Sequence, residues 1–174
     1  MRKKTIETTE MLKDSMGNAL LELMKEKPLE KITIEEMTKK ADVGRATFFR
    51  HFKSKEDLIS YRLIGMYKEY MSKQDSKSKD DLSHAKLYFD YYIETREIHL
   101  LILEAKLEST IFNAYLQLLA PASDSQPSEK VYVAYYIAYG LFGTTMKWLK
   151  DGCKETSEEM AKLCLQLISS ANEI

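Results

Sequence analysis

Cysteine, long apolar runs and catalytic motifs are scarce or missing in this chain of 174 residues. Its two cysteines, Cys153 and Cys164, supply neither a disulfide framework nor a set of metal ligands, so we expect no metal site. The basic start, residues 1–4, is not followed by the apolar run that a signal peptide requires. These absences predict a protein that stays in the cytoplasm.

The uncharged run of residues 131–146 does not predict a membrane span. A span needs roughly 20 predominantly apolar residues. This run holds four tyrosines and two threonines, and it ends at Lys147. A helix that is apolar almost all round is instead expected to be buried on every side. We therefore expect no contact with a membrane.

Motifs that carry catalysis are also absent. The sequence contains no G-x-S-x-G elbow, no glycine-rich phosphate loop and no H-E-x-x-H pair. No cysteine and histidine have a reason to lie close together. We therefore predict no catalytic residues, no cofactor and no enzymatic activity.

The most informative stretch is residues 33–58, whose pattern predicts helix, turn, helix, turn, helix. Thr33 and Glu36 form a capping box at the start of the first helix, and Ser54 marks the start of the third. Between them, the sequence Asp42-Val43-Gly44 predicts a sharp turn. We expect its glycine to supply the left-handed or cap conformation that such a turn needs.

The segment 45–53 is too short to form a stable helix in water without tertiary packing. Phe48 and Phe52 lie four residues apart, and we expect them to dock the segment on the preceding helix. The opposite face then points outward and suits a DNA major groove, where an arginine can pair with guanine and a threonine methyl can contact thymine. The residues on this face and its flanks are Arg45, Ala46, Thr47, Phe49 and Arg50.

Positive charge is concentrated on the same stretch. Residues 39–55 hold six lysines and arginines and a single acidic residue, Asp42, a local charge of +5 in a chain of net charge −1. Phosphate contacts supply most of the non-specific affinity of DNA-binding proteins, so such a basic patch is their expected footprint. The alternative is a solvated helical hairpin with chance charge, because this geometry is also common in structural bundles.

Residues 5–58 resemble the DNA-binding domain of the TetR family of bacterial transcriptional regulators, through T-I-E-E-M, A-D-V-G-R-A-T-F-F-R-H-F and K-S-K-E-D-L-I. The resemblance implies a three-helix DNA-binding domain over residues 1–53, with a recognition helix beginning at Arg45. Gly44 and Phe49 depart from the family's usual serine and tyrosine, which removes one capping oxygen and one hydroxyl for a phosphate. The matched positions for DNA contacts are Thr33, Arg45, Ala46, Thr47, Phe49, Arg50, His51 and Lys55.

The remaining residues, 54–174, show helical periodicity and complete an all-α chain. Polar or proline-containing stretches at 72–81 and 120–128 predict loops, and Thr156 with Glu159 caps a last helix. The sequence W-L-K-D-G-C-K-E-T-S-E-E-M resembles, more weakly, the C-terminal region of one TetR subgroup. It implies a helical domain for ligand binding and dimerisation.

In that family the last two helices pair with those of a second subunit, and the middle helices enclose a ligand pocket. The resemblance thus implies a homodimer and a small-molecule effector. Gly140 and Gly143 suit close approach by another helix, although the penultimate helix could also be buried within one chain. The expected dimer contacts are Tyr135, Phe142, Gly143, Met146, Leu163 and Leu167.

Candidate ligand contacts come from aromatic side chains and a histidine on the middle and penultimate helices. Aromatic side chains at helical spacing are more often core than ligand box, and a lone histidine is more often a hydrogen-bonded core residue than a sensor. No residue identifies the ligand. The candidates are Tyr88, Tyr92, His99, Phe112 and Tyr136.

Taken together, the sequence predicts a dimeric TetR-like transcriptional regulator. We expect a repressor that binds a palindromic operator in double-stranded DNA and is released by an unknown small molecule. A different class stays open: a helical ligand-binding or adaptor protein whose recognition helix, with Gly44 and Phe49, no longer binds DNA strongly. Binding to no duplex at low salt would favour that alternative.

Overall fold

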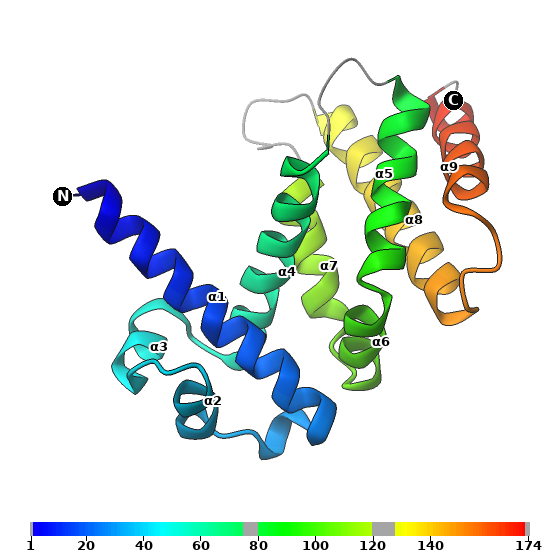
Figure 1. Cartoon of the computed structure of the whole chain (residues 1–174). Coiled ribbons are helices and arrows are strands. Elements are labelled where there is room, and N and C mark those ends of the chain that lie inside the picture. Colours follow the sequence, from blue (N-terminus) through cyan, green and yellow to red (C-terminus); the bar gives the residue numbers. More distant parts are fainter. Residues whose placement is uncertain (1, 75–79, 120–127, 173–174) are drawn as a thin grey trace. The chain divides into compact units, whose positions relative to one another are not determined.

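The computed structural model of the chain describes residues 2–74, 80–119 and 128–172 (Figure 1). These residues form helices and no strand, which confirms the all-α prediction. Loops were predicted at 72–81 and 120–128, and residues 75–79 and 120–127 of them lie outside the described residues. The elements are α1 (Arg2–Glu26), the 3-10 helix η1 (Leu29–Lys31), α2 (Ile34–Lys40), α3 (Arg45–His51), α4 (Lys55–Ser72), α5 (Asp81–Glu94), α6 (Arg96–Glu104), α7 (Glu108–Leu119), α8 (Ser128–Lys150) and α9 (Ser157–Asn172).

The helices are distributed over two compact units. Unit 1 comprises Met1–Met66 with Leu101–Ala114, and unit 2 comprises Tyr67–Leu100 with Tyr115–Ile174. Helices α4, α6 and α7 each contribute residues to both units. The predicted end of the DNA-binding domain at residue 53 divides the chain by function, and it stays a prediction.

Unit 1 is organised by the apolar stripe of α1. This stripe recurs at helical spacing, as the sequence predicts, and its side chains are almost completely buried. The same core receives side chains from η1, α2, α3 and α4. The buried residues are Met16, Ala19, Leu20 and Leu23 from α1, with Leu29, Met37, Phe48 and Leu58.

A close approach of α1 and α4 is centred on Gly17. A Cβ at this position would lie 2.9 Å from Cβ of Arg62 and 3.0 Å from its Cγ and Cδ. Arg62 is buried, and its Nε donates a hydrogen bond of 2.6 Å to Oδ1 of Asn18. Glycine is therefore the residue that lets the stem of this arginine cross α1.

In the turn between α2 and α3, the left-handed and the cap conformation belong to two different residues. Asp42 adopts the left-handed conformation, with φ 54°, whereas Gly44 is extended, with φ −69° and ψ 138°. Asp tolerates the left-handed region because its short polar side chain can hydrogen-bond locally. Gly44 is instead the N-cap residue of α3, and it offers no side-chain oxygen to the helix.

We expect Gly44→Ser to stabilise the protein by about 0.5 to 1 kcal/mol. A Cβ at position 44 meets no atom within 4 Å, and the serine would both restrict the unfolded chain and cap α3. Thermal denaturation should rank serine above Gly44→Ala, which restricts the backbone without supplying the oxygen. A loss of stability in both variants would show that the turn requires glycine.

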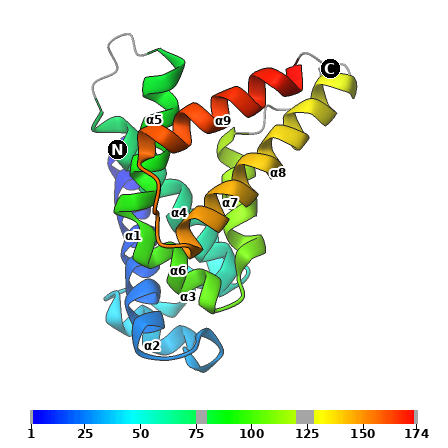
Figure 2. The ribbon, with the colours of Figure 1, turned by 90° about the vertical axis from the view of Figure 1, so that its right-hand side faces the viewer.

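Unit 2 is built around α5, against which α9 packs; in Figure 2 the two helices cross at an angle. Helix α5 buries Tyr88, Phe89, Tyr91 and Tyr92. The ring of Phe89 lies edge-on to Trp148, with centroids 5.4 Å apart, and the indole Nε1 donates to the carbonyl oxygen of Glu155 at 3.1 Å. These contacts tie the end of α8 to the core of unit 2.

The predicted cap of the last helix is confirmed. Helix α8 ends at Lys150, and Gly152 follows with φ 92°. Oγ1 of Thr156 accepts from the amide of Glu159 at 3.2 Å, and the carboxylate of Glu159 accepts from the amide of Thr156 at 2.8 Å. This reciprocal capping box starts α9.

Helix α8 is not covered on every side within the single chain, contrary to the expectation for its apolar sequence. Tyr132, Tyr136 and Tyr139 recur at helical spacing and are all exposed. Among the described residues, no helix is long and apolar enough to cross a membrane.

Candidate nucleic-acid interface

Helix α3 is held in place by Phe48 and by Phe52, the residue that follows the helix, as the sequence predicts. Phe48 and Phe52 are both buried, with ring centroids 5.9 Å apart. Phe52 also packs edge-on against Tyr61 of α4, at 5.5 Å. A helix of seven residues depends on such packing, because it is too short to be stable alone.

The opposite face of α3 is open to solvent. Arg45, Ala46 and Arg50 are exposed, Thr47 is partly exposed, and Phe49 leaves 63% of its surface uncovered. His51 is partly buried at the end of the helix. The ring of Phe49 also lies edge-on to that of Phe48, with centroids 5.4 Å apart, so part of it rests on the buried side of the helix.

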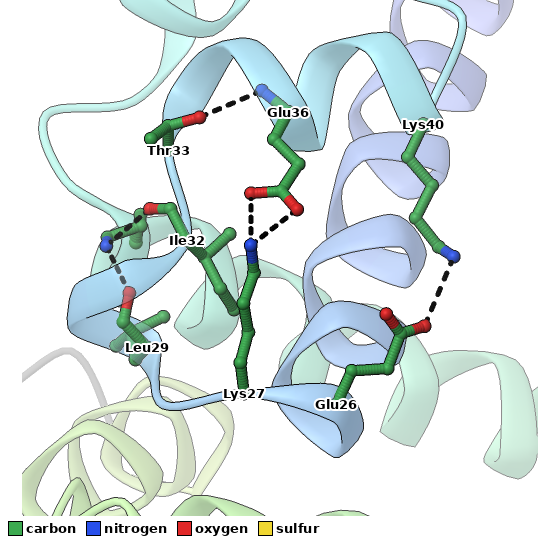
Figure 3. Close-up of polar contacts among 8 residues, drawn as sticks. Glu26, Lys27, Leu29, Ile32, Thr33, Glu36 and Lys40 are labelled. Carbon is green, nitrogen blue, oxygen red and sulfur yellow. Dashed lines mark hydrogen bonds and ion pairs between the residues drawn. The ribbon is translucent and has the colours of Figure 1, made fainter.

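Helix α2 is attached to the end of α1 by polar contacts (Figure 3). Nζ of Lys27 donates to both carboxylate oxygens of Glu36, at 2.5 and 2.6 Å, and these bonds lower the pKa of Glu36 below its usual value. Oγ1 of Thr33 accepts from the amide of Glu36 at 3.1 Å, which confirms the predicted cap. Lys40 adds an ion pair with Glu26 at 3.8 Å.

Lys55 has a structural role that sequence reasoning missed. Its Nζ donates to the carbonyl oxygens of Leu29, at 2.5 Å, and Ile32, at 2.9 Å. These carbonyls converge at η1, just before α2 (Figure 3). The lysine at the start of α4 thereby fixes the chain that leads into the helix-turn-helix. If Lys55 also contacts a DNA phosphate, the same ammonium group must serve the phosphate and these two carbonyl oxygens.

We expect Lys55→Met to destabilise the protein by about 1 to 3 kcal/mol, because two partly buried carbonyl groups lose a charged donor. Lys53→Met is the matched control, since Lys53 is exposed and carries the same charge nearby. Urea denaturation should show a loss for Lys55→Met alone. Equal stability of the two variants would mean that Lys55 is free for DNA.

The imidazole of His51 contributes less positive charge to this face near neutral pH than a histidine in water would. Burial lowers its pKa below the usual value, and the nearby cations Lys13 and Arg50 lower it further. The positive charge around α3 therefore comes mainly from Arg45 and Arg50 on the helix and from the lysines before and after it.

Three of the five residues predicted to contact a ligand lie together in unit 2. Tyr88, Tyr92 and His99 are buried together in unit 2, with ring centroids 4.9 Å apart for the two tyrosines and 4.7 Å for Tyr92 and His99. Tyr136 is 71% exposed on α8. Phe112 is partly buried and belongs to unit 1.

The buried group is neutral and rich in hydroxyls. The hydroxyl of Tyr88 lies 3.1 Å from Oγ1 of Thr145, and burial raises the pKa of both Tyr88 and Tyr92. Burial also lowers the pKa of His99 to about 4, while its Nδ1 lies 3.0 Å from the carbonyl oxygen of Thr95. Nδ1 is therefore the protonated nitrogen of a neutral ring.

The predicted dimer residues divide between the surface and the core of unit 2. Phe142 and Met146 are buried within the chain. The other four, Tyr135, Gly143, Leu163 and Leu167, are exposed. The exposed face also carries Tyr132, Tyr136 and Tyr139, which were not predicted as dimer contacts.

A cavity of about 150 Å³ opens on this face between α8 and α9. Tyr136, Gly140 and Thr144 line it from α8, and Cys164 and Leu167 line it from α9. No group of three or more metal-binding side chains occurs within the residues that the structure describes.

Comparisons with known proteins agree with this geometry. A family model described as "Bacterial regulatory proteins, tetR family" matches residues 18–61, and one described as "Transcriptional regulator C-terminal region" matches residues 85–170. The crystal structure of a TetR transcriptional regulator from Rhodococcus sp. RHA1 is similar, with a TM-score of 0.59 and 15% identity over 91% of this chain and 96% of that one. At this identity the likeness shows the fold. No curated protein is significantly similar in sequence.

Proposed function

Because this chain belongs to the TetR family of transcriptional regulators, we propose that it is a dimeric repressor that binds a palindromic operator and is released by a small molecule. The observation that carries the proposal is the open face of α3. Arg45, Phe49 and Arg50 are exposed on this face, and the buried Phe48 and Phe52 hold the opposite side of the helix. A major groove accepts such a helix, and its first residues reach the base edges.

A second subunit is supported by the uncovered face of α8 and α9. Exposed tyrosines and leucines lie there beside the exposed Gly140 and Gly143, at which a Cβ would meet no atom within 4 Å. Contiguous apolar surface of this kind marks an interaction site. A two-fold dimer would present two copies of α3 to two half-sites about one helical turn apart (~34 Å).

Release by an effector is supported by the polar interior of unit 2. Tyr88, Tyr92 and Thr145 keep hydroxyl groups in a core that apolar residues could fill. A molecule that binds among them would lower DNA affinity only by its differential affinity for the bound and released states. We propose an uncharged effector, because this group is itself neutral.

Binding of the wild type to duplexes selected from a random library tests the proposal. We expect enrichment of a palindrome, with affinity that falls steeply with salt. Dissociation by a candidate effector would test release. If no duplex binds at low salt, the protein is not a DNA-binding repressor.

Arg45→Ala should cost about 1 to 3 kcal/mol on the selected duplex and relax its preference at one base pair. The exposed Lys53 provides the contrast, since Lys53→Ala should weaken binding to all duplexes alike and flatten the salt slope by about 0.9. Fluorescence anisotropy of labelled duplexes measures both effects. A uniform loss for Arg45→Ala would assign Arg45 to the phosphates.

A further inference from the structure

Two adjacent glutamates lie in the first turn of α2, and their surroundings differ. Glu36 is partly buried, and both of its carboxylate oxygens accept hydrogen bonds from Lys27. The side chain of Glu35 is 74% exposed, and its Oε2 lies 3.6 Å from Nη1 of Arg45. Glu36 therefore fixes α2 within unit 1, whereas Glu35 places a carboxylate beside the first residue of α3.

Stability does not explain the pair of Glu35 and Arg45. Both side chains are more than half exposed, and exposed ion pairs contribute little to folding. A carboxylate in the first turn also interacts favourably with the helix dipole, but Glu36 supplies one in the same turn. The contact is better understood through what Arg45 does on DNA.

Glu35 opposes the binding of any duplex in a non-specific way. Its carboxylate lies beside Arg45, a member of the basic stretch of residues 39–55 and the first residue of α3. Its negative charge repels the phosphate backbone whatever the base sequence. A carboxylate at this position therefore lowers affinity unless it is compensated.

The arginine supplies that compensation, but only in one arrangement. A guanidinium group has five N–H donors, so a contact from Nη1 to Glu35 leaves donors on its other edges for a guanine. On DNA that lacks the right base, Arg45 could instead turn to a phosphate. That turn would leave Glu35 uncompensated beside the backbone, so the contact with Glu35 opposes it in the wild type.

We propose that Glu35 is a positioning residue that sets sequence specificity by holding Arg45 toward a base edge and penalising duplexes that lack that base. The inference rests on the proposed function, in which α3 reads DNA. Glu35 acts through Arg45 and need not touch the DNA. Discrimination between partners commonly requires such a repulsive element as well as an attractive one.

The test compares the full-length wild type with Glu35→Gln on two duplexes: the one that the wild type selects from a random library, and a scrambled duplex of the same composition. We expect Glu35→Gln to bind the scrambled duplex about three- to ten-fold more tightly and the selected duplex less than about two-fold more tightly. The ratio of the two affinities falls accordingly. The salt slope on scrambled DNA steepens by about 0.9, as the released Arg45 neutralises one more phosphate.

Two further variants separate this role from a simple change of charge. Glu26→Gln removes an exposed carboxylate that pairs with Lys40 at 3.8 Å in the same unit, and it should change both duplex affinities alike. In an Arg45→Ala background, Glu35→Gln should leave the ratio unchanged, because the two residues act together. Far-UV circular dichroism checks that each variant is folded.

Three outcomes overturn the proposal. If Glu35→Gln leaves the ratio of the two duplex affinities unchanged, Glu35 only repels DNA in general. If Glu26→Gln lowers that ratio equally, the position of the carboxylate beside Arg45 does not matter. A wild type that binds all duplexes alike would overturn the proposed readout by α3, and this inference with it. That last result is seen before any variant is made, so the two failures are distinguishable.

Discussion

Replacing Gly143 with leucine should convert the protein to a monomer and lower its affinity for a two-site operator by about 100-fold or more. Gly143 is exposed on α8, and a Cβ there would meet no atom within 4 Å, so the single chain has room for a larger side chain. A second helix that packs over this glycine leaves no room for a leucine side chain. Two tethered heads bind much more tightly than one, because the second binds at high effective concentration.

Light scattering at micromolar protein concentration measures the loss of the dimer. Binding to the selected palindrome measures the loss of operator affinity. Gly143→Ala is the matched control, since it raises helix propensity with one added carbon and should retain the dimer. Circular dichroism should show equal helix content in both variants. A wild type that is monomeric, or a leucine variant that keeps both the dimer and the affinity, would exclude dimerisation through this face.

Acid should remove about 3 kcal/mol of stability through His99 alone. The ring is buried against Tyr91 and Tyr92, and its pKa of about 4 lies below the value of about 6.5 expected in the unfolded chain. The unfolded state therefore binds the proton more readily. The contribution is complete above about pH 6.5 and is lost as the pH falls toward 4.

Urea denaturation at neutral pH and at about pH 4.5 measures this loss, and His99→Phe provides the comparison. Phenylalanine keeps the aromatic contacts and cannot be protonated, and the carbonyl oxygen of Thr95 still accepts from the backbone amide of residue 99 at 3.1 Å. Carboxylates contribute equally to both proteins. The same acid sensitivity in His99→Phe would show that another group is responsible.

The features that the sequence predicted well are local ones. The caps at Thr33, Ser54 and Thr156 and the docking of Phe48 depend on residues three or four positions apart, whose types carry the signal. The turn was harder to predict. Asp42 and Gly44 can each adopt a positive φ, and the choice depends on how α3 must leave α2.

Other features depend on partners that leave no mark in the sequence. Lys55 bonds to backbone carbonyls in another segment, and a carbonyl is present at every residue. Gly17 is explained only by the stem of Arg62, which the fold brings to it. Helix α8 is apolar almost all round, so periodicity could not separate the buried Phe142 and Met146 from the tyrosines at the surface.

The single tryptophan gives unit 2 an optical signal of its own. Trp148 is buried against Phe89, and the chain has no other indole. Selective excitation of indole therefore reports on the end of α8 alone, whereas circular dichroism averages over the helices of both units. If acid loosens unit 2 first, the emission of Trp148 should shift to longer wavelength while much of the helical signal remains. Coincident transitions would instead mean that the two units unfold together.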